Sequence, residues 1–326
     1  MKEIRTRCIL NLKDPLSLDS TFTALTNFIF AQKNAGKFFV YIENSPHIET
    51  KYLEDLVWLG ISSNAEPLRQ SDRLSIYKKY TEKLLNEDKA FYCYCAEEEL
   101  KKAQEEALKN WQNPHYNGRC RNLSSEEKKQ FEDEGRQPVI RFKTLAKEII
   151  HHDLIRGKIT FPDFTLGDFV IVEKSGAPTY TFAACIDDAL MPITHVLRSE
   201  QYFSHTCKEI MLQEILELPT PHYGHFFMLR GEDETGKIEK LSSRHGAHDL
   251  CFYKKSNYKK EAIIHYLMSL YVSLPDKNKE PFDMNYFLEN FTLDHFKKNI
   301  PIFNSKKLDE LNVHFCHSRE SRNPGT

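Results

Sequence analysis

The chain has 326 residues, of which 40% are hydrophobic and 12% aromatic, enough to fill the cores of two or three packed units. The 45 Lys and Arg residues nearly balance 47 Asp and Glu residues, and the net charge of −2 excludes a globally basic nucleic-acid coat. The mean hydropathy of −0.56 and the lack of a long apolar run predict that no segment spans a membrane.

The start of the chain and its cysteines favour the cytoplasm. Residues 1–13 place charges on both sides of a short apolar patch, unlike a secretory signal. Without such a signal, the 8 cysteines are expected to be free thiols rather than a disulfide framework. We therefore expect a cytoplasmic protein.

The first elements in chain order predict a β-α-β unit. Residues 4–12 have the pattern of a strand, residues 19–34 repeat apolar side chains at helical spacing, and residues 36–44 form a buried type of strand. Asp19 or Ser20 is the candidate N-cap of the helix. Two strands joined by a helix within about forty residues indicate a parallel sheet.

The rest of the chain divides into segments of different composition. Residues 49–60 and 69–86 have amphipathic helical patterns. Over 87–183, charged helical stretches precede the alternating stretches VIRFKT, GKITF and DFVIVEK, which predict an antiparallel insertion of different architecture. Mixed patterns return over 184–246, and helical patterns follow. The aperiodic end, 313–326, is expected to be disordered.

Three stretches are more specific than these patterns: GKFFVYIEN (36–44), APTYTFAACIDDALMPITHVLRSEQY (177–202) and KIEKLSSRHGAHDL (237–250). In this order and spacing they resemble the catalytic core of the glutamyl-tRNA synthetases, a class I family, from about residue 4 to about residue 312. The resemblance implies an α/β fold. A split Rossmann-like parallel sheet would carry an inserted α+β acceptor-stem-binding domain and a short helical C-terminal region.

The resemblance also implies domain limits. The expected parts are the first half of the core (1–86), the insertion (87–183), the second half with the KLSSR loop (184–246), a helical stem-contact-like region (247–312) and a disordered tail (313–326). The family's anticodon-binding domain has no counterpart in this pattern. We therefore expect a truncated family member.

A reaction follows from the resemblance. In the family, the glutamate carboxylate attacks the α-phosphate of ATP, bound with Mg, and the adenylate then passes glutamyl to the terminal ribose of tRNA. Such chemistry depends on positive charge and hydrogen-bond donors around the phosphates. The family supplies them from a His-Ile-Gly-type signature at the first helix and a Lys-Met-Ser-Lys-Ser-type loop near the end of the core.

Both signatures are altered in this chain. Counting back without gaps from the matching helix places Ser17 at the imidazole position and Asp19 at the glycine against which adenine lies. In the loop, Lys240 and Ser242 are kept as candidate catalytic residues, whereas Ser243 replaces the second lysine. A carboxylate facing a triphosphate opposes it by about 4 kcal/mol at 4 Å and an effective dielectric of 20. We expect impaired adenylation, with the arginine after Ser243 as a partial substitute.

The resemblance also carries over four candidate substrate-binding residues. Arg7 matches the arginine that receives the glutamate side-chain carboxylate, a bidentate role that suits a guanidinium. Glu43 matches the acid that binds the amino group, and Tyr180 and Arg198 match two further amino-acid contacts. Taken singly, Arg7 also fits an edge charge and Tyr180 a core position. Together the four residues favour a pocket for L-glutamate.

A metal site is predicted in the insertion. Cys93, Cys95 and Cys120 are grouped, and thiolates favour a tetrahedral Zn²⁺ ion. Some glutamyl and glutamyl-queuosine enzymes share this pattern with tyrosine or histidine as the fourth ligand, and here Tyr116 is preferred to His115. The alternative is three buried thiols without metal. We expect one structural zinc without a catalytic role.

Three functions are compatible with these residues. The first is a glutamate–tRNA ligase of low activity, which the retained substrate residues favour. The second is an inactive paralogue that binds the tRNA acceptor stem, glutamate or a partner synthetase, which the altered signatures favour. A glutamyl-queuosine-type enzyme ranks third, because that type normally keeps the nucleotide signatures. In each case we expect a monomer without a membrane partner.

Overall fold

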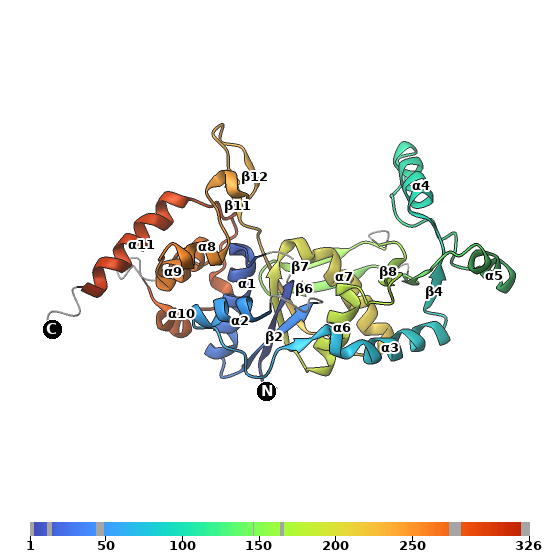
Figure 1. Ribbon diagram of the computed structural model, residues 1–326, viewed down its shortest axis with the longest axis horizontal. Helices are drawn as coiled ribbons and strands as arrows, with labels where there is room; N and C mark the ends of the chain where they lie inside the picture. The colour runs from blue at the N-terminus through green and yellow to red at the C-terminus, as the bar shows by residue number, and fades with distance from the viewer. Residues whose placement is uncertain are drawn as a thin grey trace.

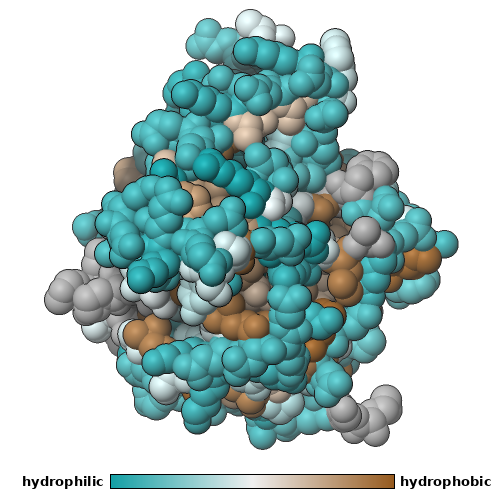
Figure 2. Space-filling model, turned by 90° about the vertical axis from the view of Figure 1, so that its right-hand side faces the viewer, coloured by the Kyte–Doolittle hydropathy of each residue, from teal (hydrophilic) through white to brown (hydrophobic). Residues whose placement is uncertain are grey.

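A computed structural model describes residues 3–11, 15–43, 49–145, 147–163, 166–273 and 282–320. The molecule is elongated, with the last helices of the chain at one end and α4 (Glu97–Lys109) and α5 (Ser125–Asp133) at the other (Figure 1). Hydrophilic side chains cover most of the face at the α4–α5 end, and hydrophobic ones show between them in small patches (Figure 2).

The predicted β-α-β unit is confirmed. β1 (Arg5–Asn11) pairs in parallel with β2 (Lys37–Glu43), and β2 pairs in parallel with β3 (Leu68–Arg69). The connection between β1 and β2 is α1 (Leu18–Lys33), ten of whose residues are buried. The helix predicted over 69–86 begins later, at α3 (Leu74–Asn86), because Leu68 and Arg69 are used in the sheet and a 3₁₀ turn follows them.

A second pair of parallel strands completes the core. β9 (His195–Ser199) pairs with β10 (His222–Phe226), and α7 (Phe203–Leu216) connects them. β9 approaches β1 from the side opposite β2, since the Arg5 carbonyl accepts a hydrogen bond from Thr194 N at 2.9 Å. The strand order therefore reverses between β1 and β9. In open parallel sheets, the crevice beyond the carboxyl ends at such a point is the usual ligand site.

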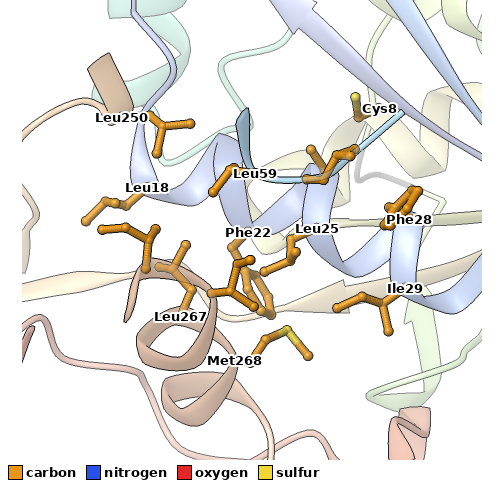
Figure 3. Packing of buried hydrophobic residues seen from close by; sticks show 14 of the residues in the cluster. Cys8, Leu18, Phe22, Leu25, Phe28, Ile29, Leu59, Leu250, Leu267 and Met268 are labelled. Carbon is orange, nitrogen blue, oxygen red and sulfur yellow. The ribbon is translucent and has the colours of Figure 1, made fainter. Parts of the chain in front are cut away.

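Apolar side chains of α1 join the sheet to the C-terminal helices. Phe22 and Leu25 of α1 lie against Leu267 and Met268 of α9 (Lys260–Tyr271), as Figure 3 shows. The ring of Phe22 also stacks on Tyr271 with centroids 3.7 Å apart. These side chains are all nearly inaccessible to solvent, so α9 is part of the same core as the sheet.

The insertion has its own antiparallel sheet. β5 (Val139–Phe142) lies between β4 (Ala90–Cys93) and β8 (Phe169–Val172). The stretch GKITF does not join it: it forms β7 (Gly157–Phe161), which pairs with an unpredicted strand, β6 (Ile149–Asp153). Leu154 N donates to the Tyr223 carbonyl, so this hairpin lies against the core. α6 (Tyr180–Leu190) spans the expected limit between 183 and 184.

The remaining elements are mostly helical and short. They are α2 (Glu49–Trp58), β11 (Arg230–Glu232), β12 (Ile238–Lys240), α8 (Leu250–Lys255), α10 (Met284–Asn290) and α11 (Ser305–Glu320). α11 corrects the disorder expected after residue 312, and residues 321–326 lie outside the described part. Leu308 is buried, and the Phe315 ring lies 6.3 Å from that of His265 on α9, which gives this helix an apolar contact. No helix among the described residues has the length and apolar character needed to cross a membrane.

Candidate nucleotide, amino-acid and metal sites

The first helix begins after β1, and its N-cap is Ser17. The expected N-cap, Asp19 or Ser20, is wrong, because both residues lie within the first turn of α1. The Ser17 hydroxyl oxygen accepts a hydrogen bond from Ser20 N at 3.1 Å. Serine is among the preferred residues at this position because it satisfies a free N–H group of the first turn. The serine at the predicted imidazole position therefore starts the helix and brings no ring nitrogen or charge.

Asp19 lies in the first turn of α1 and is held by two other parts of the chain. Its Oδ1 accepts hydrogen bonds from Leu229 N at 3.0 Å and from the Tyr271 hydroxyl at 3.2 Å. Burial raises the pKa of the Asp19 carboxyl, and the hydrogen bond from Leu229 opposes that shift. A side chain with an acidic group thus occupies the start of the helix, tied to the segment after β10 and to the end of α9.

The KLSSR loop lies after the β11–β12 hairpin, which projects from the core in Figure 1. Lys240 is exposed at the end of β12 and makes no ion pair within the described residues. Ser242 N donates to His245 Nδ1 at 3.1 Å, and Ser243 is exposed in the following 3₁₀ turn. A Cβ at Gly231 would lie 2.4 Å from the His245 ring, so this histidine needs the glycine opposite it.

The arginine considered as a partial substitute has a partner of its own. Arg244 Nη2 donates to Glu239 Oε1 at 2.9 Å, and the Arg244 side chain is 77% exposed. The same Glu239 oxygen lies 3.2 Å from His245 Nε2. Exposed ion pairs contribute at most about 1 kcal/mol, so Glu239 weakly restrains Arg244 without removing it from solvent.

Arg7 is buried and held by a carboxylate that the sequence did not assign to it. Its Nε and Nη2 donate to the two oxygens of Asp188 at 2.9 and 2.8 Å. Burial alone lowers the pKa of Arg7, yet the Asp188 carboxylate keeps that pKa well above its ordinary value. The bidentate pair fixes the plane of the guanidinium, so Asp188 determines which N–H groups of Arg7 remain for a ligand.

Arg198 shows the same arrangement on β9. Its Nη1 and Nη2 donate to the oxygens of Glu209 on α7 at 3.0 and 2.6 Å, and Nη2 also lies 2.6 Å from the Thr206 hydroxyl. Burial alone would raise the pKa of Glu209. The positive charge and hydrogen bonds of Arg198 outweigh that effect, so the pKa of Glu209 lies below its ordinary value. Each candidate carboxylate-binding arginine is therefore neutralised by a buried partner.

Tyr180 and Glu43 line one cavity between the sheet and α6. The Tyr180 ring stacks on Tyr202 with centroids 5.6 Å apart, and burial raises the pKa of its hydroxyl while the positive charges of Arg7 and Arg198 lower it. Tyr180 thus lies near Arg7 and Arg198 and shares a cavity with Glu43, although neither arginine is among the described residues that line that cavity. The rest of the cavity wall is mostly apolar. A bound ligand would therefore be oriented by hydrogen bonds to these few polar groups.

The predicted metal ligands also come together. The sulfurs of Cys93, Cys95 and Cys120 all lie within 4.8 Å of one another, and Cys95 Sγ is 3.5 Å from Cys120 Sγ. The Tyr116 hydroxyl lies 3.5 Å from Cys93 Sγ and 3.8 Å from Cys95 Sγ. Hydrogen bonds from Cys120 and Cys95 lower the pKa of the Cys93 thiol, which favours a thiolate in the cluster.

This donor set fits zinc. Tetrahedral coordination with Zn–S distances of about 2.3 Å places sulfurs about 3.8 Å apart, close to the spacing in the cluster. His115, the alternative fourth ligand, is not part of the group of candidate ligands found among the described residues. The Tyr116 hydroxyl contacts two of the thiols and accepts a hydrogen bond from Cys120 N at 2.7 Å, which keeps Tyr116 as the preferred fourth ligand. A zinc ion here would join β4 to the loop at 116–120 and stabilise the insertion.

Some residues at the site were missed from the sequence. Neither Asp188 nor Glu209 is among the predicted site residues, although they hold Arg7 and Arg198. Asp187, beside Asp188, accepts hydrogen bonds from Arg73 Nε at 2.7 Å and from the Tyr77 hydroxyl at 2.6 Å. The acidic pair of α6 therefore links β1 on one side to the start of α3 on the other. The only available signal was two adjacent acids in an otherwise apolar helix.

Parallel strands whose order reverses between β1 and β9, with an insertion between the two halves, define a Rossmann-like α/β core. The family described as tRNA synthetases class I (E and Q), catalytic domain, matches residues 18–310. The chain belongs to this family. The match begins at Leu18, so β1 with Arg7 and the N-cap Ser17 lie outside the matched residues.

Similar proteins are glutamate–tRNA ligases. The chain is 40% identical to glutamate–tRNA ligase 1 of Caldicellulosiruptor saccharolyticus, with 95% of this chain and 66% of the relative covered. It is 39% identical to the ligase of Carboxydothermus hydrogenoformans, with 97% and 68% covered. The chain thus spans about two thirds of the length of these relatives.

Solved structures agree with this assignment. A glutamate tRNA ligase from Elizabethkingia meningosepticum, in complex with its amino acid, superposes with a TM-score of 0.85 at 30% identity, covering 97% of this chain and 70% of that one. The glutamate–tRNA synthetase of Elizabethkingia anophelis gives a TM-score of 0.86 and covers 97% and 71%. The predicted α/β fold and the predicted family are confirmed.

Proposed function

We propose that this protein is a glutamyl-tRNA synthetase-like protein that binds L-glutamate and the acceptor stem of tRNA, and whose ATP-dependent formation of glutamyl adenylate is impaired. The observation that carries the proposal is the place of Asp19. Its side chain lies where the resemblance implies a glycine beneath adenine, and Leu229 and Tyr271 hold it there. An acidic group at that point opposes the phosphates of ATP and fills space.

The changes at the second signature support the same conclusion. Ser243 brings no ammonium group to the phosphates, and the neighbouring Arg244 faces Glu239. Removing one preorganised donor from a transition state typically lowers the rate by about 10² to 10³. Lys240 and Ser242 remain as candidate catalytic groups, so the loop would keep part of its ability to stabilise the phosphates.

The amino-acid side of the site supports retained binding of glutamate. Arg7 and Arg198 keep rigid, carboxylate-held guanidinium groups, and Glu43 and Tyr180 share one cavity. Such preorganisation reduces the entropy lost when a ligand binds. We also propose one structural Zn²⁺ held by Cys93, Cys95, Cys120 and Tyr116, a monomeric state and a cytoplasmic location.

A second candidate function is a binding protein without chemistry. The pairing of Arg244 with Glu239 favours it, because that contact draws the candidate substitute for the missing lysine toward a carboxylate. Such a protein would hold glutamate, an acceptor stem or a partner synthetase. A glutamyl-queuosine type stays third, since Ser17, Asp19 and Ser243 all depart from the signatures that this type keeps.

Pyrophosphate exchange that depends on glutamate, measured with and without tRNA, tests the proposal. We expect a rate at least about 10³ below that of a relative with both signatures intact. Asp19→Gly, Ser17→His and Ser243→Lys in one chain should raise the rate by more than the product of the single effects, because the three groups act on one transition state. A wild-type rate within tenfold of the relative contradicts the impairment. Undetectable exchange in the triple variant, with glutamate still bound, favours the binding protein.

A further inference from the structure

A cavity of about 350 Å³ lies where the insertion meets α7 of the core, away from the predicted glutamate pocket. Arg141 of β5, Lys208 of α7 and His115 line it from three different elements. One carboxylate, Asp168, is present among its described lining residues. The cavity therefore gathers cationic and N–H groups with little negative charge to balance them.

Arg141 is the unusual member of this group. Three arginines are buried among the described residues, and Arg7 and Arg198 each have a bidentate carboxylate partner. Arg141 is 8% exposed and has none: its Nη1 donates to the Asp168 carbonyl at 2.9 Å, and its Nε has no hydrogen-bond acceptor among the described residues. A buried cation without a counter-charge is costly, so an anion at this position would be stabilised.

The other charged residues of the cavity do not supply the missing counter-charge of Arg141. Asp168 Oδ1 accepts a hydrogen bond from Thr144 N at 2.8 Å, and Oδ2 lies 3.5 Å from Arg121, so its carboxylate is already engaged. Lys208 makes no ion pair within the described part of the chain and lies 5.4 Å from the Phe169 ring. Burial lowers the pKa of Lys208, as expected for an ammonium without an acidic partner.

His115 contributes a third group with spare capacity. Its Nε2 is buried and has no hydrogen-bond partner among the described residues. The backbone at Gly167 approaches His115 closely, since a Cβ there would lie 2.6 Å from His115 Cβ, and both residues line the cavity. Phosphate oxygens accept several hydrogen bonds at once, and arginine and lysine are the side chains that most often provide them.

We propose that this cavity binds a phosphate group, with Arg141, Lys208 and His115 as its donors. The phosphate is either free in solution or part of an RNA backbone that lies across the junction of the insertion and the core. The site is separate from the candidate ATP and glutamate sites, so it does not depend on whether adenylation survives.

One competing explanation concerns Arg141 alone. Its guanidinium lies 4.1 Å from the centroid of the Tyr116 ring, and three thiolates around one Zn²⁺ would carry a net negative charge. Arg141 would then be the counter-charge of the metal cluster. That explanation leaves Lys208 without a role, because Lys208 is not in the cavity wall that contains the cysteines. The two accounts therefore differ at Lys208.

Calorimetry and thermal unfolding of the zinc-loaded chain test the proposal. Inorganic phosphate is titrated at constant ionic strength against chloride, and a short RNA duplex with a 3′ single-stranded end is titrated separately. The variants are Lys208→Met and the matched control Lys129→Met, which removes an exposed lysine of α5. Arg141→Met is added, with zinc content measured for every chain.

We expect Lys208→Met to weaken binding about tenfold and to reduce the phosphate-induced rise in Tm, while Lys129→Met behaves as wild type. If the effect appears with inorganic phosphate, the source is free phosphate, and if it appears only with the duplex, the source is an RNA backbone. Equal affinities of Lys208→Met and Lys129→Met for both ligands overturn the proposal. Loss of zinc in Arg141→Met with unchanged phosphate binding also overturns it.

Discussion

Replacing Asp19 with asparagine separates charge from shape at the start of α1. Asparagine keeps an oxygen that accepts from Leu229 N and the Tyr271 hydroxyl, so the local hydrogen bonds survive. Asp19→Gly removes the charge, the volume and both hydrogen bonds. The pair of variants therefore distinguishes repulsion of the phosphates from occupation of the adenine position.

The expected magnitude follows from Coulomb's law. Two unit charges 4 Å apart interact by about 4 kcal/mol at an effective dielectric of 20. The two donors that bond to Asp19 and the surrounding water screen most of this repulsion. We expect about 1 kcal/mol of it to remain, which corresponds to about a fivefold change in the affinity for ATP. Asp19→Gly should bind ATP more tightly still, because the space beneath adenine opens as well.

Calorimetric titration of Mg-ATP into the three proteins at pH 8 measures the effect. A pH above neutrality is chosen because burial raises the pKa of Asp19, and the wild-type carboxyl must be ionised. The gain in Asp19→Asn should shrink when salt is added, since the interaction is electrostatic. Identical isotherms for wild type and Asp19→Asn refute the role of charge. A gain confined to Asp19→Gly assigns the block to volume.

Three further predictions concern metal, the arginine partner and pH. The purified chain should contain one zinc, and Cys93→Ser should lose it and unfold the insertion at lower temperature, whereas less than a tenth of an equivalent in wild type contradicts the site. Asp188→Asn should destabilise the fold by about 3–5 kcal/mol in urea unfolding, because it leaves Arg7 buried without its counter-charge. Asp19→Asn should raise Tm at pH 7. Because the pKa of Asp19 is higher in the folded than in the unfolded chain, wild type loses stability as the pH rises above about 3.9. The difference in Tm between the variant and wild type should therefore vanish below that pH.

Local patterns in the sequence were enough to predict the elements that meet at the site. The spacing of apolar residues located α1, and the two flanking strands indicated their own parallel pairing. The grouping of Cys93, Cys95 and Cys120 was also predictable, because cysteines with ligand-like spacing need little tertiary information. By contrast, β6 was missed: its sequence IIHHD puts two histidines in the strand, and one of them is buried beside the core.

The partners of the charged residues were not predictable from local patterns. Arg7 and Asp188 are separated by 181 residues, and Asp19 and Leu229 by 210, so only the folded chain brings them together. Arg198 and Glu209 are closer in sequence, yet their contact depends on how α7 packs against β9. A sequence pattern identifies which residue types are present, but not which carboxylate will neutralise which guanidinium.

The contacts of Asp19 have a further consequence for how the nucleotide site is restored. Its carboxylate connects α1 to the segment after β10 and to Tyr271 at the end of α9, whose ring stacks on Phe22 within the main core. Glycine at this position would leave the Leu229 N–H and the Tyr271 hydroxyl without their acceptor, at a cost of about 1–3 kcal/mol for each group that stays buried. The residue proposed to oppose ATP therefore also connects α1 to the C-terminal helices, and replacing it with glycine should lower the stability of the core.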